Sequence, residues 1–141
     1  MVSNEMLVKK AYEAQKFAYT PYSQFRVGAA LLAKNGTIYL GCNIENAAYS
    51  PTNCAERTAF FKAVSEGVTE FEAIAIVGNT KDAAEEQKEY CAPCGVCRQV
   101  MAEFCDPKTF RVILGKSETD FVEYKLEEVL PFGFTKEDMR R

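Results

Sequence analysis

The segment FEAIAIVG, residues 71–78, places the strongest constraint on the fold because it is almost continuously apolar. A strand with one solvated face alternates apolar and polar residues, whereas a strand that is covered on both faces is apolar nearly throughout. We therefore expect this segment to be a central strand with helices on both faces of its sheet. The pattern indicates a layered α/β architecture.

The remaining segments alternate between helical and extended patterns around this strand. Ser3 or Asn4 is suited to cap the first helix, and Asn35-Gly36 is a turn pair that favours a tight hairpin. The order α-β-β-α-β-α-β-β-α predicts a mixed sheet with helices on both faces. The predicted elements are a helix over 4–19, a hairpin over 25–43, a helix over 53–67, the central strand, a charged loop over 79–90, a helix from Pro93, strands over 109–115 and 120–124, and a short helix within 125–134.

Length and composition narrow the class of protein. The chain has 141 residues, of which 48% are hydrophobic and 26% charged, and this predicts one domain over residues 1–141. Its net charge is −3 and no stretch is strongly basic, so we expect no binding to nucleic acid. No apolar run resembles a signal peptide or a membrane span, so the expected location is cytoplasmic, without contact to a membrane.

Six cysteines in a chain without histidine limit the available chemistry. In a reducing compartment, clustered cysteines bind metal or react more often than they form disulfides. The lack of any imidazole excludes serine–histidine and cysteine–histidine nucleophile systems. A metal centre built from sulfur ligands is the favoured alternative.

The segment EYCAPCGVCRQV, residues 89–100, contains two overlapping CxxC pairs, Cys91/Cys94 and Cys94/Cys97. Cys94 lies at the start of one predicted helix and Cys54 at the start of another. Helix N-termini favour the thiolate form of cysteine. If both helices start at the same edge of the sheet, Cys54 and a CxxC pair converge. Three thiolates leave the fourth tetrahedral position of zinc open, which is the arrangement of a catalytic site.

Two other interpretations of the cysteines stay open from the residues alone. A lone CxxC pair also serves as a dithiol redox couple. A structural zinc site would need a fourth protein ligand, and Cys91, Cys42 or Cys105 could supply it.

Glu56 also has two interpretations. The spacing Asn53-x-x-Glu56 matches a capping box, in which the glutamate only satisfies the helix start. A carboxylate two residues from a zinc ligand is instead placed to accept a proton from activated water and pass it to a substrate. The neighbouring Cys54 favours this second interpretation.

The residues CAE at 54–56 and PCGVC at 93–97 resemble the signature of the zinc-dependent nucleoside and nucleobase deaminases. From about Tyr19 to Phe134 the chain is similar to the short, homotetrameric, all-cysteine cytidine deaminases. The resemblance implies a three-layer α-β-α sandwich with a mixed five-stranded sheet, one Zn²⁺ per subunit and a nucleoside substrate. The zinc ligands that it implies are Cys54, Cys94 and Cys97, with Cys91 as a bystander thiol.

The implied reaction is the hydrolytic deamination of cytidine and 2′-deoxycytidine, a step of pyrimidine salvage. Water activated by zinc attacks C4 of the cytosine ring, while Glu56 transfers protons to N3 and to the departing amino group. Three thiolates and a dication leave a net charge of −1. Arg57 and Arg98 are expected to offset it by donating hydrogen bonds to sulfur, and the alternative is that both are solvated surface charges.

The segment GCNIENAAYS, residues 41–50, carries the implied ribose site, formed by Asn43 and Glu45. Amide and carboxylate groups suit a hydroxyl, which both donates and accepts hydrogen bonds, whereas turn chemistry is the alternative for Asn43. Phe25 is implied to contact the nucleoside, with a core position as its alternative. The other implied contacts are the backbone of Ala55, the interface residues Ala47 and Tyr49, and Phe134, or else Phe132, stacking on the base from a neighbouring subunit.

Two rival functions remain. A related deaminase of an aminoacylated nucleoside antibiotic shares the zinc core but, by the same resemblance, lacks the pair formed here by Asn43 and Glu45. A structural-zinc or redox module, from a different class, would leave the absorbance spectrum of a nucleoside unchanged. Conversion of cytidine to uridine distinguishes all of these.

Overall fold

A computed structural model describes residues 2–139 of the chain and contains one five-stranded sheet of order β2-β1-β3-β4-β5. Strands β3 and β4 are parallel, and the other neighbouring pairs are antiparallel. The apolar segment therefore lies at the centre of a mixed sheet, as predicted. The strands are β1 (Phe25–Ala33), β2 (Ile38–Cys42), β3 (Phe71–Thr80), β4 (Arg111–Gly115) and β5 (Phe121–Lys125).

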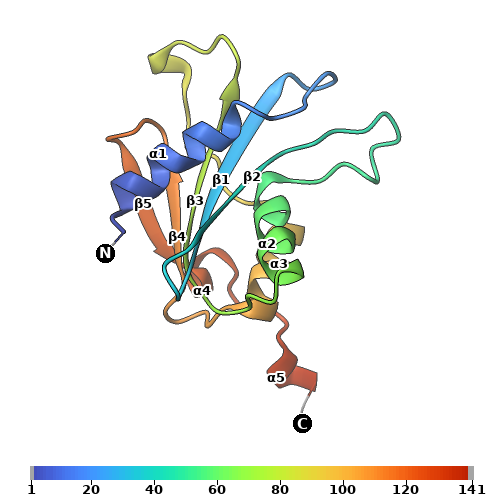
Figure 1. Ribbon diagram of the computed structural model, residues 1–141, viewed down its shortest axis with the longest axis vertical. Coiled ribbons are helices and arrows are strands. Elements are labelled where there is room, and N and C mark those ends of the chain that lie inside the picture. Colours follow the sequence, from blue (N-terminus) through green and yellow to red (C-terminus); the bar gives the residue numbers. More distant parts are fainter. Residues whose placement is uncertain (1, 140–141) are drawn as a thin grey trace.

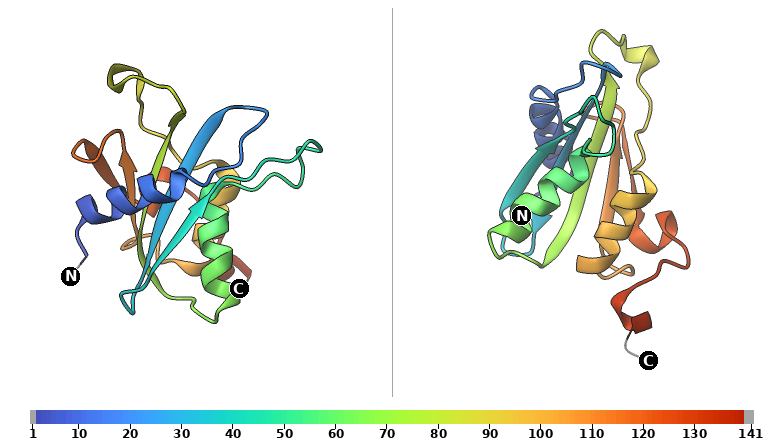
Figure 2. Two further views of the ribbon diagram at one scale, coloured as in Figure 1. Left: turned by 45° about the horizontal axis from the view of Figure 1, so that its top comes forward. Right: turned by 90° about the vertical axis from the view of Figure 1, so that its right-hand side faces the viewer.

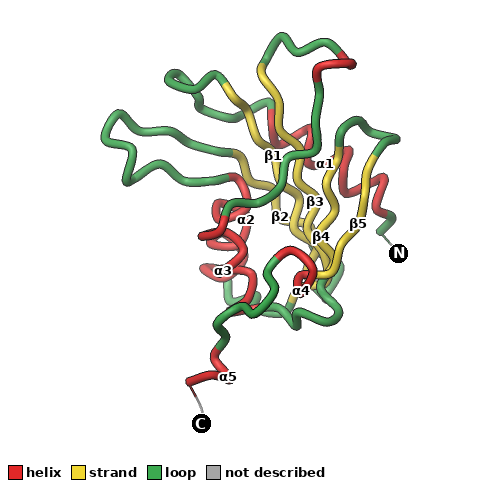
Figure 3. The backbone as a smooth tube through the Cα atoms, turned by 180° about the vertical axis from the view of Figure 1, so that it is seen from behind, coloured by secondary structure: helices red, strands yellow, loops and turns green. Residues whose placement is uncertain are grey.

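Helices cover both faces of this sheet, which confirms the three-layer α-β-α sandwich (Figures 1 and 3). Helix α1 (Asn4–Gln15) crosses one face, while α2 (Ala55–Ser65) and α3 (Gly95–Phe104) lie side by side on the other. The short segments are η1 (Glu85–Gln87), α4 (Leu126–Val129) and α5 (Lys136–Met139). Within the described residues, no helix is long and apolar enough to cross a membrane.

Alternate residues of β3 enter two separate cores, because successive side chains of a strand point to opposite faces. Ala75 and Val77 pack with Leu7 under α1. Ile74 and Ile76 join the second core, which contains Phe60 and Met101 of the two other helices. Burial of each large side chain contributes roughly 1.5–3 kcal/mol. The two cores hold the long helices α1, α2 and α3 at fixed positions on the sheet.

Gly41 sets how closely α2 approaches the sheet. A Cβ atom at this position would lie only 2.3 Å from the carbonyl oxygen of Ala55. Any larger residue would therefore push the start of α2 away from β2. The absence of a side chain brings the first turn of α2, with Cys54 before it and Glu56 within it, against the edge of the sheet.

Several predicted boundaries differ from those observed. Helix α1 ends at Gln15 rather than continuing to residue 19, and α5 was not predicted. Helix α3 begins at Gly95 with Cys94 as its N-cap, so Pro93 precedes the helix instead of lying in its first turn. The helical spacing of Val96, Val100, Met101 and Phe104 predicts that all four lie on the buried side of α3. Val96 is instead 57% exposed, because Cys97 and Met101 occupy the buried positions.

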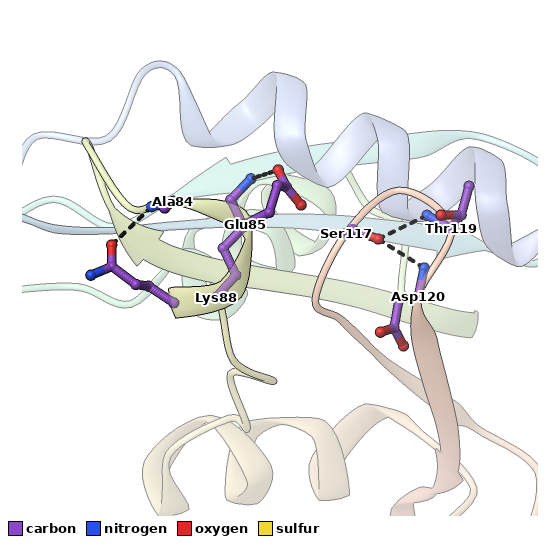
Figure 4. A network of polar contacts seen from close by, with 7 residues as sticks. Ala84, Glu85, Lys88, Ser117, Thr119 and Asp120 are labelled. Atoms are coloured by element: carbon purple, nitrogen blue, oxygen red, sulfur yellow. Dashed lines mark hydrogen bonds and ion pairs between the residues drawn. The ribbon is translucent and has the colours of Figure 1, made fainter.

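The loop between β3 and α3 contacts α1 and the segment before β5, and Figure 4 shows the hydrogen bonds within this loop and within that segment. The ammonium group of Lys88 forms an ion pair with Glu85 at 2.9 Å and lies 5.6 Å from the centre of the Tyr12 ring in α1. The Tyr90 hydroxyl donates to Asp120, beside β5, at 2.7 Å. These contacts fix the path of the chain just before Cys91.

Candidate metal centre

The two helices on one face of the sheet begin side by side, and each has a cysteine as its N-cap. The backbone of Cys54 (φ −77°, ψ 155°) and that of Cys94 (φ −69°, ψ 167°) are both extended, as N-cap geometry requires. Cys97 lies in the first turn of α3, and its N–H donates to Cys94 Sγ at 3.5 Å. The predicted convergence of helix starts is therefore observed.

Cys54, Cys94 and Cys97, called here the sulfur cluster, have a geometry that fits one zinc ion. Their Sγ atoms all lie within 4.8 Å of one another, with 3.8 Å between Cys54 and Cys94 and 3.5 Å between Cys94 and Cys97. Tetrahedral zinc with Zn–S bonds of about 2.3 Å requires sulfur atoms about 3.8 Å apart. The cluster therefore matches the size of the ion without rearrangement of the backbone.

The other three cysteines do not complete a four-sulfur site. Within residues 2–139, the sulfur cluster is the single group of three or more potential ligands close enough to hold a metal. Cys42, Cys91 and Cys105 lie outside it, and all six cysteines are free thiols rather than disulfides. The geometry thus favours three protein ligands and argues against a closed structural site.

Arg57 contacts the sulfur cluster directly. Its Nη2 donates to Cys54 Sγ at 3.3 Å. The pKa of the Cys54 thiol is lowered to about 5, first by a hydrogen bond from Cys97 and then by Arg57. Cys97, which shares this hydrogen bond and is buried, has a raised pKa. The guanidinium group that was predicted to offset the charge of the sulfur cluster therefore lies beside Cys54.

The hydrogen-bond partners of Arg98 are not the sulfur atoms that were predicted. Its Nε donates to the carbonyl oxygen of Pro93 and its Nη1 to that of Val129, each at 2.8 Å. These bonds tie the loop before Cys94 to the end of α4. The side chain therefore joins two backbone segments, and within the described part of the chain no hydrogen bond to sulfur is found for it.

Glu56 is buried beside the sulfur cluster. It is 4% exposed, and among residues 2–139 it is the single charged residue in the buried class. Burial raises the pKa of its carboxyl group to about 7; its own backbone N–H opposes this rise, and the nearby charge of Cys54 adds to it. A carboxyl group in this environment exchanges protons near neutral pH.

The capping-box interpretation of Glu56 is wrong. The N-cap of α2 is Cys54 rather than Asn53. The Asn53 side chain instead donates to Thr58 Oγ1 at 3.2 Å. Glu56 therefore has no role as the partner of an Asn53 cap.

Asn43 and Glu45 join the start of β1 to the segment after β2. Asn43 Oδ1 accepts from the N–H of Val27 and its Nδ2 donates to the carbonyl of Phe25, both at 2.9 Å. A carboxamide has two donor hydrogens and two acceptor positions, so half of its capacity remains for a ligand. The turn-like contacts of Asn43 therefore coexist with a capacity to bind.

Glu45 is held by two residues that the sequence analysis did not single out. Its carboxylate accepts hydrogen bonds from the N–H of Tyr22 at 3.0 Å, from the N–H of Ser23 at 3.1 Å, and from the Ser23 hydroxyl. The hydroxyl bond is the main reason that the pKa of Glu45 is lowered. A cavity of about 400 Å³ opens here, and its lining is formed by Tyr22, Ser23, Glu45, Asn46, Tyr49 and Thr52.

The remaining predicted substrate residues lie either at the start of β1 or α2, or on segments that project from the body. Ala55 is fully buried at the start of α2, and Phe25 is 39% exposed, so Phe25 is no core residue. Tyr49 is 79% exposed, and Ala47 is also exposed, on the segment 46–51 that projects from the body (Figures 1 and 2). Phe134 is 54% exposed on the C-terminal segment.

Comparisons with known proteins agree with this geometry. Residues 1–113 match the family model described as "Cytidine and deoxycytidylate deaminase zinc-binding region". The chain is 53% identical over 135 residues to the cytidine deaminase of Sporosarcina psychrophila, covering 96% of this chain and 93% of that protein. It is 51% identical over 138 residues to the cytidine deaminase of Halalkalibacterium halodurans, covering 98% of each. A crystal structure of cytidine deaminase from Burkholderia pseudomallei matches with a TM-score of 0.83 at 43% identity, covering 94% of this chain and 100% of that chain.

Proposed function

The chain belongs to the cytidine and deoxycytidylate deaminase family, and on that premise we infer that it is a zinc-dependent cytidine deaminase. It hydrolyses cytidine and 2′-deoxycytidine to uridine and 2′-deoxyuridine and releases ammonia. The observation that carries this conclusion is a buried glutamate, Glu56, beside a cluster of three sulfur ligands sized for one zinc ion. A closed structural site or a dithiol couple needs no such carboxylate.

Zinc would be held by Cys54, Cys94 and Cys97, and when bound it lowers the pKa of a coordinated water toward about 7. Glu56 accepts one proton from the attacking water and delivers it to N3 of the cytosine ring. After C4 is attacked, the same carboxyl group carries the second proton of that water to the departing amino group. Ammonia leaves and the uracil ring remains, so Glu56 ends in its initial state.

Arg57 supports this chemistry by offsetting the charge of the sulfur cluster. Three thiolates around a dication carry a net charge of −1, which weakens the polarisation of a substrate or of water. The hydrogen bond from Arg57 Nη2 to Cys54 Sγ withdraws part of that charge. The guanidinium group therefore raises the electrophilic character of the site without occupying a ligand position.

The nucleoside is bound by residues from several segments. Asn43 and Glu45 take the ribose hydroxyls with the hydrogen-bonding capacity that the contacts of Asn43 to β1 and of Glu45 to Tyr22 and Ser23 leave free. Phe25 packs against the nucleoside, and the backbone of Ala55 contacts the base. Arg98 acts indirectly, by fixing the loop that carries Cys94.

The protein acts as a single domain over residues 1–141 that assembles into a homotetramer with pockets shared between subunits. The exposure of Tyr49 and Phe134 supports this, because large aromatic side chains at interfaces are buried by a partner. In this arrangement Ala47, Tyr49 and Phe134 complete the pocket of a neighbouring subunit, with Phe134 stacking on the base. The setting is cytoplasmic pyrimidine salvage.

The decisive experiment incubates the purified, zinc-loaded protein with cytidine and follows conversion to uridine by absorbance and chromatography. The matched variant Glu56→Gln keeps the size of the side chain but removes its proton transfer. It should retain zinc and lose turnover by at least about 10²–10⁴-fold. A zinc-loaded protein that leaves cytidine unchanged would refute the proposal. Activity on an aminoacylated cytosine nucleoside alone would identify the antibiotic deaminase instead.

A further inference from the structure

Two side chains from distant parts of the chain share the space beside Gly78. Gly78 lies on β3 opposite Val27 of β1. A Cβ atom at Gly78 would lie 2.7 Å from Cys91 Sγ and 2.9 Å from Phe25 Cε1, which is closer than non-bonded atoms approach. The absence of a side chain on β3 therefore lets the Cys91 thiol and the Phe25 ring occupy this space together.

The main chain of Phe25 is fixed by the proposed ribose site. Its N–H donates to Ser23 Oγ at 3.0 Å, and its carbonyl accepts from Asn43 Nδ2 at 2.9 Å. Ser23 in turn donates to Glu45. These contacts hold the backbone but leave the ring free to rotate about its side-chain bonds, so its orientation depends on what it packs against.

Cys91 is the other side chain that lies beside Gly78. It lies outside the sulfur cluster but packs against the same core as Cys54 and Val27. Burial, with added effects from the charges of Glu56 and Cys54, raises the pKa of its thiol to about 11, so it is neutral at pH 7. A neutral thiol behaves as a small, polarisable apolar group that packs well against an aromatic ring.

The position of Cys91 is itself fixed. The preceding residue, Tyr90, donates to Asp120 at 2.7 Å, and Lys116 lies over the Tyr90 ring at 5.6 Å from its centre. The docked loop thus holds the thiol against β3 from one side, while the backbone contacts of Phe25 bring its ring from the other.

We propose that Cys91 is a positioning residue of the substrate pocket, whose thiol, seated beside Gly78, holds the Phe25 ring in the orientation that packs against the nucleoside. This inference rests on the proposed function, in which Phe25 contacts the substrate. Cys91 therefore contributes to nucleoside affinity although it binds no zinc.

Truncation of the thiol tests the proposal. Cys91→Ala should raise KM for cytidine roughly three- to ten-fold, with kcat within about two-fold and zinc retained, because the ring loses its support. Cys91→Ser, which keeps most of the volume, should raise KM less. An unchanged KM in Cys91→Ala would overturn the proposal, as would a folded Cys91→Ala protein that has lost its zinc.

A double-mutant cycle separates positioning from simple filling of space. In a Phe25→Ala background, Cys91→Ala should change KM by less than about two-fold, since no ring remains to be positioned. Equal effects of Cys91→Ala in the presence and absence of the ring would overturn the proposal.

Alkylation provides a measurement that does not depend on turnover. Phe25→Ala should uncover the Cys91 thiol, so iodoacetamide should modify Cys91 of the zinc-loaded protein several-fold faster, as located by peptide mass spectrometry. An unchanged rate would contradict the contact. If the protein without substitutions fails to deaminate cytidine, the proposed function is refuted. The alkylation rates still decide whether Phe25 and Cys91 pack together.

Discussion

Cys54, Cys94 and Cys97 lie at the starts of two helices that pack on the sheet, whereas Tyr49 and Phe134 lie on segments that project from it. The first group is held by the hydrophobic core beneath α2 and α3 and by the close approach of α2 at Gly41, so its geometry follows from folding of one chain. The second group exposes large aromatic side chains to solvent. We call the projecting segments 46–51 and 130–135 the exposed segments.

The exposed segments also contain strained backbone, whereas Cys54 and Cys94 have ordinary extended backbone. Tyr49 (φ 50°) and Phe132 (φ 57°) both lie in the left-handed region, and Phe132 is fully exposed. This conformation costs roughly 1–2 kcal/mol for a residue with a side chain. No burial within the chain offsets that cost at Phe132. The three sulfur ligands are thus brought together within one chain, whereas the exposed segments are the parts that the proposed homotetramer would cover.

Loss of one sulfur ligand should have the largest effect. Cys97→Ser should release zinc and reduce turnover by at least about 10²-fold, because a hydroxyl does not replace a buried thiolate ligand. Zinc is measured by elemental analysis after dialysis. Cys91→Ser is the control and should keep its zinc. The reverse pattern would place the metal on the other CxxC pair.

Removal of the guanidinium group beside the sulfur cluster should have the next largest effect. Arg57→Ala should weaken zinc binding by about 10–100-fold, because it removes the donor to Cys54 Sγ. Competition with a chelator measures the affinity. Arg98→Ala should lower the free energy of unfolding but leave zinc affinity closer to that of the unmodified protein. Equal losses of zinc affinity would show that charge balance is not specific to Arg57.

The exposed segments can be tested through subunit mixing. Phe134→Ala should raise KM about 10-fold with zinc retained, since base stacking contributes roughly 1–3 kcal/mol. Co-assembly of Phe134→Ala subunits with Glu56→Gln subunits should restore tight substrate binding in some pockets. Active-site titration of the mixture checks this. If the mixture binds substrate no more tightly than the separate variants, each pocket is built from one chain. The exposed segments would then not complete the pocket of a neighbouring subunit.

The smallest effect is expected at Phe132. Phe132→Gly relieves the left-handed strain and should raise the free energy of unfolding by up to about 1 kcal/mol, after allowance for the greater freedom of glycine in the unfolded chain. Urea denaturation measures this, with Phe132→Ala as a control that keeps the strain. KM should not change. A clear rise in KM would assign base stacking to Phe132 instead of Phe134.

The sheet, the two long helices on its second face and the sulfur cluster were predictable because each has a local signal. The apolar run of residues 71–78 indicated a central strand, and Cys54 and Cys94 coincide with the starts of helical patterns. The choice of Cys97 over Cys91 came from the family resemblance. Glu56 was predictable from its place beside Cys54. Its burial was not, because a helix pattern alone does not distinguish a capping side chain from one enclosed by a neighbouring helix.

The unpredicted features are contacts between residues far apart in the sequence. The bonds from Ser23 to Glu45 and from Arg98 to Val129 depend on how segments pack, and neither leaves a periodic pattern. The same is true of Cys91 and Phe25, whose side chains both lie beside Gly78 in space that a side chain on β3 would occupy. The partners of polar residues in loops can therefore be identified only from the folded structure.

The single parallel pair of the sheet, β3 with β4, has a consequence for the folding kinetics. Its strands are joined through α3, and pairing between strands that are distant in sequence is slow because the intervening loop must close first. Cys94 lies 40 residues from Cys54, so we expect these two ligands to meet late in folding. Metal bound to the finished structure should slow unfolding much more than it accelerates refolding, so its protective effect would be found in the lifetime of the native state.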